Sequence, residues 1–431
     1  MVYTSPSVVI DNGLYKTRAG FLLEDIPLVV FNSNYVVDNG TVLFGDDNIN
    51  AHPQAEVMTV MDNGVIYDFE RIVHNWEYVY NTIDNGSGVK PNEYPLVLTE
   101  PCWNTTKDRL RTCQIVFEQF QVPLFSLIKT PLSQLYHAGK LTGLVIDIGS
   151  SVALVTPILD GIIQTKSAFH SKYAGDFLNL HLSAYLDTKC PLDSLLPAKY
   201  STASPSFKHY YVLHHLLQDY KMLSISSLYN LQPLNYLQLP LGDHIAVNDA
   251  PNVLQNLFQP GVMQVPGVEI PQPLVDKPHT HGLTNLVFLC LKLLESAMLP
   301  LDNTQGSAKF ARFNETFKTL LANVLVTGGT SLAPGLSEQI LNDIRALTPQ
   351  YFPNYGISPY AINLVSPNQA NDINDTWERQ FSAWLGASNL ALMLNDRNEE
   401  SNLVNIAMEN WFVTKADYEE MGEDFIVERF K

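Results

Sequence analysis

The stretch of sequence that decides the fold is Gly143-Leu-Val-Ile-Asp147-Ile-Gly149-Ser-Ser-Val152-Ala-Leu-Val-Thr-Pro157. An apolar run ends at Asp147, a glycine follows two residues later, and a second apolar run begins at Val152. Short apolar runs of this kind predict buried strands, and the small residues between them predict a tight turn. We therefore expect a β-hairpin with an acidic side chain at the end of its first strand.

A similar pattern opens the chain, because Val8-Val9-Ile10 precedes Asp11-Asn12-Gly13 and a second strand is expected through Phe21. The repeated order of strand, Asp-x-Gly and strand predicts two related halves, which normally leave a cleft between them. Chance similarity of two short hairpins is the alternative interpretation. A further turn, Gly328-Gly329-Thr330, follows an apolar strand and precedes a helix that is expected to end near Ala346.

The composition of the 431-residue chain is apolar and acidic. Hydrophobic residues make up 46% and aromatic residues 10%, which excludes a disordered chain. The 44 acidic residues outnumber the 26 basic ones, and the formal net charge of -18 opposes contact with phosphate backbones. We therefore expect no direct binding to DNA.

The cysteine pattern and the hydropathy pattern indicate the redox compartment of the chain and its relation to membranes. Its four cysteines form no C-x-x-C pair, so we expect free thiols in a reducing compartment. The longest apolar run, 286–301, contains Lys292 and Glu295, and it predicts a buried helix rather than a membrane span. The N-terminal residues do not match a secretory signal, and no membrane partner is expected.

The three turns, in this order, resemble the phosphate- and nucleoside-binding segments of the actin superfamily. Leu257-Phe-Gln-Pro260, Glu378-Arg-Gln-Phe-Ser-Ala-Trp-Leu-Gly386 and Trp411-Phe-Val-Thr-Lys-Ala-Asp-Tyr418 are also similar to actin segments. Ser171-Lys-Tyr-Ala-Gly-Asp-Phe-Leu178 and Thr348-Pro-Gln-Tyr351 resemble, more narrowly, the actin-related protein seven group of fungal SWI/SNF and RSC chromatin remodellers. The resemblance implies an α/β, actin-like fold, in which two ribonuclease H-like halves form two lobes around a central cleft.

The resemblance also implies a domain division. An outer, small domain would comprise residues 1–131 and 381–431, with a shortened insertion at about 33–62. An inner, large domain would comprise residues 132–380, with a divergent sub-domain at about 174–265. Eight prolines fall among residues 231–280, which predicts loops and short edge strands there rather than a long helix. Residues 395–410 are expected to form a polar connection that is inserted relative to actin.

The resemblance implies that eight residues of this chain line a nucleotide cleft: Asp11, Gly13, Arg18, Asp147, Gly149, Gly328, Gly329 and Thr330. No set of metal ligands is predicted beside them. Backbone amides of such turns hold phosphate oxygens, which requires small residues. Here Leu14 and Tyr15 stand where actins carry Ser and Gly, and Ser150-Ser151 replaces Asp-Gly. The water-orienting Gln and His of actin match Thr130 and Leu154.

The loss of both water-orienting groups implies that ATPase activity is absent, because such assistance contributes about 10²–10⁴ in rate. No cofactor is firmly predicted. Retained ATP binding is one alternative, and a vestigial cleft in which Asp11 and Asp147 only stabilise their turns is the other.

Two further features concern partners. Residues Tyr35 to Phe44 enclose the turn Asp38-Asn39-Gly40, which predicts a tight hairpin in place of actin's long filament-forming loop, so we expect no self-polymerisation. In actins, a groove at the end of the molecule opposite the nucleotide mouth accepts amphipathic helices. The residues that match its lining are Tyr136, Gly139, Leu385 and Leu390. They predict a docking site for a partner helix, and simple packing of the hinge is the alternative.

The resemblance as a whole implies a non-catalytic subunit of a nuclear, ATP-dependent chromatin-remodelling complex. Its implied partners are the basic helicase-SANT-associated helix of the motor subunit, a second actin-related protein that forms a heterodimer with it, and a small stabilising subunit. An acidic subunit suits a basic helix, because complementary charge steers association. The alternatives are a capping subunit of a cytoplasmic actin-like filament of the dynactin type, and an active actin-superfamily ATPase.

Overall fold

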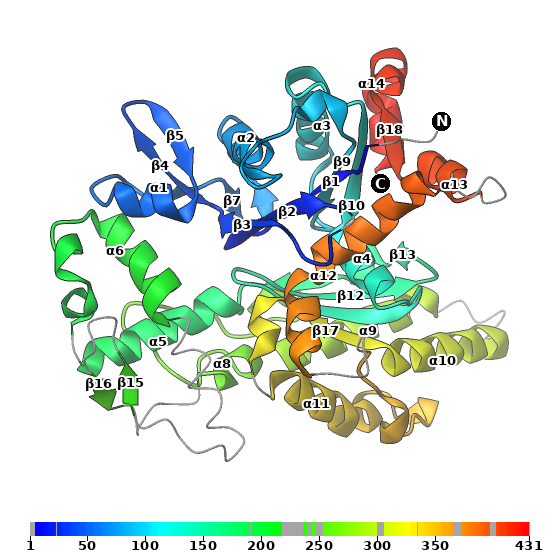
Figure 1. The fold of residues 1–431 in the computed structure, drawn as a ribbon. Helices are drawn as coiled ribbons and strands as arrows, with labels where there is room; N and C mark the ends of the chain where they lie inside the picture. Colours follow the sequence, from blue (N-terminus) through cyan, green and yellow to red (C-terminus); the bar gives the residue numbers. More distant parts are fainter. Residues whose placement is uncertain are drawn as a thin grey trace. The chain divides into compact units, whose positions relative to one another are not determined.

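The computed structural model describes the chain in ten segments: residues 5–22, 24–189, 191–217, 236–238, 244–246, 253–299, 306–333, 335–365, 372–396 and 402–430. The chain divides into two compact units (Figure 1). Unit 1 contains Met1–Ala51, Met58–Lys140 and Pro367–Lys431, and unit 2 contains His52–Val57 and Leu141–Ser366. The domain boundaries expected from the sequence, near 131 and 381, stay a prediction.

A six-stranded mixed sheet forms the centre of unit 1, in the order β18-β10-β9-β1-β2-β3. The strands are β1 (Val8–Asn12), β2 (Lys16–Phe21), β3 (Val29–Asn32), β9 (Leu96–Glu100), β10 (Leu124–Lys129) and β18 (Phe412–Thr414). Strand β1 pairs antiparallel with β2 and parallel with β9, which in turn is parallel to β10. The first predicted hairpin is therefore confirmed.

Both faces of this sheet are covered, because alternate side chains of a strand point to opposite faces. Val8 and Ile10 lie in one core cluster with Trp76 of α2 (Ile72–Thr82), whereas Val9 lies in another with Trp384 of α12 (Asp372–Leu392). Figure 1 shows α2 and α3 (Thr106–Gln114) on one side of the sheet and α12 with α4 (Thr130–His137) on the other. A π-helical turn, Ile115–Gln119, extends α3.

The contact between α4 and α12 depends on one glycine. A Cβ atom at Gly386 would lie 1.9 Å from the carbonyl oxygen of Ser133, so only glycine lets the two helices approach this closely. Two shorter helices, α13 (Leu403–Asn410) and α14 (Lys415–Arg429), close unit 1. The expected polar connection at 395–410 is thus wrong in part, because Ala407 is buried and anchors α13 as a helix.

Unit 1 also carries a small sheet in the order β5-β4-β6, made of β4 (Asn34–Asp38), β5 (Thr41–Phe44) and β6 (Met58–Thr59), with α1 (Asp46–Ala51) beside it. Tyr35 pairs with Phe44 across the hairpin, as predicted. Its two turn residues, Asn39 and Gly40, have φ angles of 49° and 83°, which is the conformation of a tight hairpin turn. A second small hairpin joins β7 (Met61–Asp62) to β8 (Val65–Ile66).

The sheet of unit 2 has the order β13-β12-β11-β17, and β14 also pairs with β12. Its strands are β11 (Gly143–Ile148), β12 (Ala153–Leu159), β13 (Ile162–Ile163), β14 (Phe169–Ser171) and β17 (Val324–Thr327). The antiparallel pairing of β11 with β12 confirms the hairpin predicted from 143–157, and β17 runs parallel to β11.

Helices supply most of the remaining core of unit 2. The ones that bear on the site are α5 (Gly175–Lys189), α6 (Pro205–Tyr211), α9 (Leu283–Met298), α10 (Gly306–Ala322) and α11 (Leu336–Tyr351). Helix α9 is the buried helix expected from the apolar run, and its side chains join those of β11, α10 and α11 in one cluster. The described part of unit 2 also includes the π-helical turn Val212–Leu216, α8 (Gln255–Phe258), and the paired strands β15 (Tyr236–Gln238) and β16 (His244–Ala246).

Several expectations fall partly outside the described residues. These are the divergent sub-domain at 174–265, the proline-rich stretch at 231–280 and Cys190. Cys102, Cys113 and Cys290 are free thiols. Among the residues that the structure describes, no helix is long and apolar enough to cross a membrane.

Candidate functional site

The turn between β1 and β2 in unit 1 places Asp11 opposite Arg18 in the register of the two strands. The Arg18 Nη1 atom lies 3.0 Å from Asp11 Oδ2, and the hydroxyl of Thr99 donates to Asp11 Oδ1 at 2.6 Å. The side chains of Asp11 and Arg18 are only 10% and 15% exposed. Both oxygens of this carboxylate are therefore engaged by the protein itself.

The backbone of this turn is also engaged. The N–H group of Gly13 donates to the carbonyl oxygen of Lys16 at 3.1 Å, and the hydroxyl of Ser33 donates to the carbonyl oxygen of Gly13 at 2.6 Å. A Cβ atom at Gly13 would lie 3.5 Å from Arg18 Nη1, so the guanidinium group lies close to the turn. Leu14 packs against the core of unit 1. The backbone N–H and carbonyl groups of Gly13 are thus both hydrogen-bonded within unit 1.

A polar network below the turn was not found from the sequence. The indole N–H of Trp76 donates to Asn12 Oδ1 at 2.9 Å, and the amide of Asn12 donates to Asn75 Oδ1 at 3.0 Å. Asn75 also bonds to Thr17, which is fully buried. The available signal was the pair Asn75-Trp76 in an amphipathic helix. A buried amide needs hydrogen-bond partners, so the pair could have predicted a buried polar network.

The turn between β11 and β12 in unit 2 is held differently. The N–H group of Gly149 donates to the carbonyl oxygen of Val152 at 2.9 Å. The carbonyl oxygen of Gly149 accepts from the hydroxyl of Thr330 at 2.7 Å and from the N–H group of Gly175 at 3.1 Å. The structure thus brings together three residues that are distant in sequence.

Two glycines make this close approach possible. Gly328 has a φ angle of 90°, and a Cβ atom there would lie 2.3 Å from Asp147 Oδ1 and 2.5 Å from the carbonyl oxygen of Ile148. A Cβ atom at Gly175 would lie 2.6 Å from the Thr330 hydroxyl, although sequence reasoning did not assign Gly175 to the site. Gly329, by contrast, has open space where its Cβ atom would be. Gly328 and Gly175 are therefore required by packing.

Thr130 occupies the place where the family resemblance puts a water-orienting glutamine. It is the first residue of α4, and its hydroxyl donates to the backbone carbonyl oxygen of Glu100 at 3.1 Å. That bond ties the start of α4 to the end of β9. The hydroxyl of Thr130 therefore has a structural partner.

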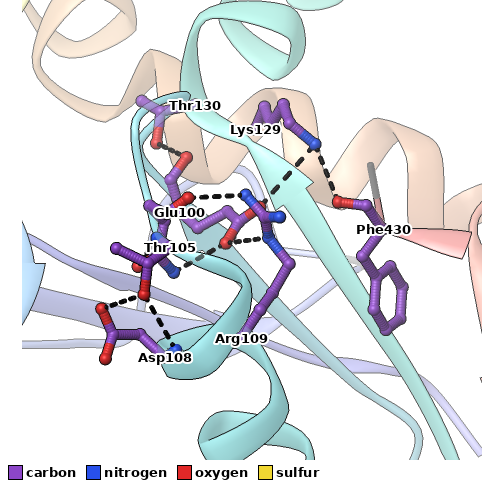
Figure 2. Close-up of polar contacts among 8 residues, drawn as sticks. Glu100, Thr105, Asp108, Arg109, Lys129, Thr130 and Phe430 are labelled. Atoms are coloured by element: carbon purple, nitrogen blue, oxygen red, sulfur yellow. Dashed lines mark hydrogen bonds and ion pairs between the residues drawn. The ribbon is translucent and has the colours of Figure 1, made fainter. Parts of the chain in front are cut away.

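Figure 2 shows a buried ionic cluster beside Thr130 that the sequence did not reveal. The Arg109 Nε atom lies 2.8 Å and 3.0 Å from the two carboxylate oxygens of Glu100, which is 3% exposed. The Lys129 ammonium group lies 3.7 Å from Glu100 and donates to the carbonyl oxygen of Phe430 at 3.0 Å. The cluster thus joins β9, β10, α3 and the end of the chain's last helix.

Burial dominates the electrostatics of this cluster. Burial lowers the pKa of Lys129 and raises the pKa of Glu100, because a low-dielectric surrounding disfavours each charged form. The opposite charges of Arg109 and Lys129 act against the shift at Glu100. Such a cluster fixes the packing of the elements that it joins, because each buried charge needs its partner.

The residues expected to line a partner groove all belong to unit 1. Tyr136, Leu385 and Leu390 pack in the same cluster as Trp384, and Leu390 is only 6% exposed. Gly139 is exposed and has a φ angle of 67°, just after the end of α4. The structure brings Tyr136, Leu385 and Leu390 together where α4 packs on α12, and the role of all four residues in docking stays a prediction.

No group of three or more His, Cys, Asp or Glu side chains that could hold a metal ion is found among the described residues. Asp11, which would face the metal-bound nucleotide that the family resemblance implies, already accepts hydrogen bonds from Arg18 and Thr99 on its two oxygens. The glycine turns of unit 2 keep the backbone shape without the second acid, since Ser150-Ser151 stands there.

Comparison with known proteins gives a consistent result. The family described as Actin matches residues 3–230 and 314–431. Actin-related protein 4 of Yarrowia lipolytica is 26% identical over 99% of this chain and 96% of its own length. The SWI/SNF and RSC complexes subunit arp42 of Schizosaccharomyces pombe is 28% identical over 99% of both chains, and actin-related protein 7 of Saccharomyces cerevisiae is 25% identical over 98% of both.

Proposed function

The chain belongs to the actin family, and from this premise we propose that it is a non-catalytic actin-related subunit of a nuclear, ATP-dependent chromatin-remodelling complex. In this proposal it binds the helicase-SANT-associated helix of the motor subunit together with a second actin-related protein. It thereby regulates how strongly ATP hydrolysis by the motor is coupled to DNA translocation. A small stabilising subunit completes the proposed assembly.

The names of the relatives support membership of a chromatin-remodelling complex. One of them is named a subunit of the SWI/SNF and RSC complexes, and the similarity extends over 99% of both chains. The family includes active ATPases, so family membership alone does not decide whether this chain is catalytic.

The observation that carries the non-catalytic part is the closed turn at Asp11. Its two carboxylate oxygens already accept from Arg18 and Thr99, and the adjacent guanidinium charge balances the acid, which weakens the attraction of Asp11 for a hydrated metal ion. The hydroxyl of Thr130 bonds to the backbone, and Leu154 offers no polar atom where a water would be oriented. Phosphoryl transfer to water depends on such positioning and charge stabilisation.

A phosphate-release assay tests this part. Purified protein with Mg²⁺ and ATP is expected to release no more phosphate than a protein-free blank, with skeletal actin as the positive control. Mass spectrometry of the supernatant after denaturing the native protein is expected to find no stoichiometric ATP or ADP. Turnover similar to that of actin would contradict the proposal.

The partner proposal rests on charge and on the α4–α12 seam. With a net charge of -18 the chain favours a basic partner, and association is expected to weaken as salt rises. Affinity purification from nuclear extract is expected to recover a remodeller motor and a second actin-related protein. Recovery of dynein-activator subunits instead would favour the filament-capping alternative.

A pair of variants refines the partner test. Leu385→Glu places a charge on the half-buried seam, and it is expected to reduce recovery of the motor subunit by about tenfold or more, the loss typical of a central interface residue. Ile162→Glu, at a 66% exposed position of unit 2, serves as the control for an added charge. Equal recovery with both variants, when both remain folded by circular dichroism, would place the motor helix elsewhere.

A further inference from the structure

The tripeptide Asp-Asn-Gly occurs four times in the chain, at residues 11–13, 38–40, 62–64 and 84–86, and all four copies lie in unit 1. In an Asn-Gly pair the side-chain amide can react with the next backbone nitrogen, because glycine has no Cβ atom to crowd the approach. Since the four copies share this local sequence, a difference in their reactivity has to come from the structure around them.

The reaction is intramolecular. The backbone nitrogen of the glycine forms a bond to Cγ of the asparagine, the glycine N–H proton passes to solvent, and the side-chain nitrogen leaves as ammonia. Water then opens the resulting succinimide ring at either carbonyl, which gives aspartate or isoaspartate. Ring closure turns the peptide plane between the two residues, so any contact that holds this plane, the amide or the nitrogen slows the reaction.

The copy at 38–40 forms the tip of the β4–β5 hairpin. Asn39 and Gly40 are both exposed, and a Cβ atom at Gly40 would lie within 4 Å of no atom of the described residues beyond its chain neighbours. The strand pairing ends at Asp38 and Thr41, so the N–H group of Gly40 lies outside the ladder. The amide of Asn39 donates to Asp38 Oδ2 at 3.2 Å in an exposed contact. The amide and the attacking nitrogen are thus both open to solvent.

The copy at 62–64 has the same turn under a cover. The φ angle is 49° at both Asn39 and Asn63, and the amide of Asn63 donates to Asp62 as its counterpart does to Asp38. The difference is Trp103, whose indole N–H donates to the carbonyl oxygen of Asn63 at 3.1 Å. A Cβ atom at Gly64 would lie 3.2 Å from the same indole ring. Ring closure at Asn63 therefore has to break this bond and move against the ring.

The other two copies are held at the attacking nitrogen. The N–H group of Gly86 donates to the carbonyl oxygen of Thr82 at 2.9 Å, and that of Gly13 donates to Lys16 at 3.1 Å. At Asn12 the amide itself is also fixed, because its oxygen accepts from an indole and its nitrogen donates within the polar network below the turn. Both reactions start from groups that are already hydrogen-bonded.

We propose that Asn39 is a modification site, at which the folded protein converts asparagine to aspartate and isoaspartate ahead of the three other copies. The contrast between Asn39 and Asn63 carries the proposal, because the tripeptide and its backbone conformation are shared and the cover by Trp103 is not. The proposal does not depend on the remodelling role.

The conversion changes the tip of the hairpin in a defined way. It adds a negative charge beside Asp38, and isoaspartate also adds a methylene group to the backbone of a turn that requires left-handed φ angles at both positions. The base of the hairpin is held by Tyr35 and Phe44, which are each 2% exposed and have ring centroids 5.3 Å apart. The change is therefore confined to the tip, and unit 1 stays folded.

Ageing of the purified full chain tests the proposal. The protein is kept at neutral pH and physiological temperature, and peptide mapping by mass spectrometry follows the conversion of all four copies in one sample. Asn39 is expected to convert at least about tenfold faster than Asn63, the effect of one ordinary hydrogen bond that has to break before the ring closes. An isoaspartyl methyltransferase with S-adenosylmethionine is expected to label the Asn39 peptide. In denaturing urea, the four rates are expected to become similar.

Two variants separate the amide from its cover. Asn39→Gly leaves Gly-Gly, which suits this turn, and is expected to abolish the early conversion without changing the rate at Asn63. Trp103→Phe keeps an aromatic ring beside Gly64 and removes the indole N–H group. It is expected to raise the rate at Asn63 by roughly five- to tenfold and to leave Asn39 unchanged. Circular dichroism checks that both variants are folded.

Several results would overturn the proposal. Equal rates at Asn39 and Asn63 in the folded protein would do so, as would a faster rate at Asn12 or Asn85. The same relative rates in the folded and the urea-unfolded chain would show that local sequence decides. An Asn39 that converts in urea and stays intact in the folded protein would show that the hairpin protects it.

Discussion

The two hairpins that carry Asp11 and Asp147 are built to the same plan and stabilised by different means. In each hairpin the aspartate pairs in register with the residue seven positions later, which is Arg18 in unit 1 and Leu154 in unit 2. Unit 1 thus closes its turn with an ion pair, whereas unit 2 closes its turn by packing Gly328 against Asp147.

This difference shows that two hairpins with the same register can be stabilised by different means. The cation at position 18 balances the charge of Asp11 from within unit 1. Unit 2 keeps the glycine approach and the bond from Thr330 to Gly149, which define the shape of the turn. The ion pair stabilises the turn of unit 1, and the close approach of glycine stabilises the turn of unit 2.

The largest expected loss of stability comes from a substitution that disrupts the packing at Gly328 in unit 2. Gly328→Ala adds a Cβ atom 2.3 Å from Asp147 Oδ1 on a backbone with a φ angle of 90°. We expect a loss of about 3 kcal/mol or more in the free energy of unfolding of unit 2. Denaturant titration with exchange mass spectrometry, which resolves the units, measures it. Gly329→Ala, with open space at that position, is the control and should cost less than about 1 kcal/mol.

The next largest loss of stability is expected when the ion pair between Asp11 and Arg18 in unit 1 is removed. Arg18→Met leaves Asp11 as a buried carboxylate without its cation, and we expect a loss of about 2–4 kcal/mol in unit 1. The double variant Asp11→Asn with Arg18→Met removes both charges and should recover part of the loss. Thermal unfolding of the three proteins in parallel measures it. A double variant that is less stable than Arg18→Met would mean that the ion pair is not what closes this turn.

A smaller loss of stability is expected when the Thr330 hydroxyl, which bonds to Gly149 in unit 2, is removed. Thr330→Val keeps the shape of the side chain and removes the bond to the carbonyl oxygen of Gly149, which is expected to cost about 1–2 kcal/mol. Thr330→Ser retains the hydroxyl and should cost less. Urea unfolding curves distinguish the two, and an equal loss in both variants would assign the effect to the methyl group.

The smallest effect is a pH dependence on the α4–α12 seam. Burial lowers the pKa of His137 below its ordinary value of 6.5, so the unfolded chain takes up a proton at higher pH than the folded chain does. Stability is therefore expected to fall as pH drops through about 6.5, by about 1 kcal/mol between pH 7.5 and 5.5. Comparing unfolding of wild type and His137→Gln at both pH values isolates this histidine. An identical pH dependence in both proteins would contradict it.

Sequence reasoning succeeded where a local pattern determines a local structure. The hairpins at Asp11 and Asp147, the tight turn at Asn39-Gly40 and the buried helix α9 all follow from short-range periodicity and turn chemistry, and all are confirmed. Membership of the actin family is confirmed as well. Helix α13 was missed, although Leu403 and Ala407 are apolar at helical spacing, because the polar residues that precede it were taken to continue through residue 410.

The sequence alone predicted the family and the two similar hairpins, and the resemblance implied that Thr130 and Leu154 replace two polar groups of actin. Those conclusions need only residue types and their order along the chain. The tertiary structure decided what the remaining groups do: Thr99 lies 88 residues from Asp11 in sequence, and Thr330 lies 181 residues from Gly149. A hydrogen bond or a steric limit is a relation between atoms in space, so only the folded chain shows that Asp11 is already paired and that Gly328 must remain glycine.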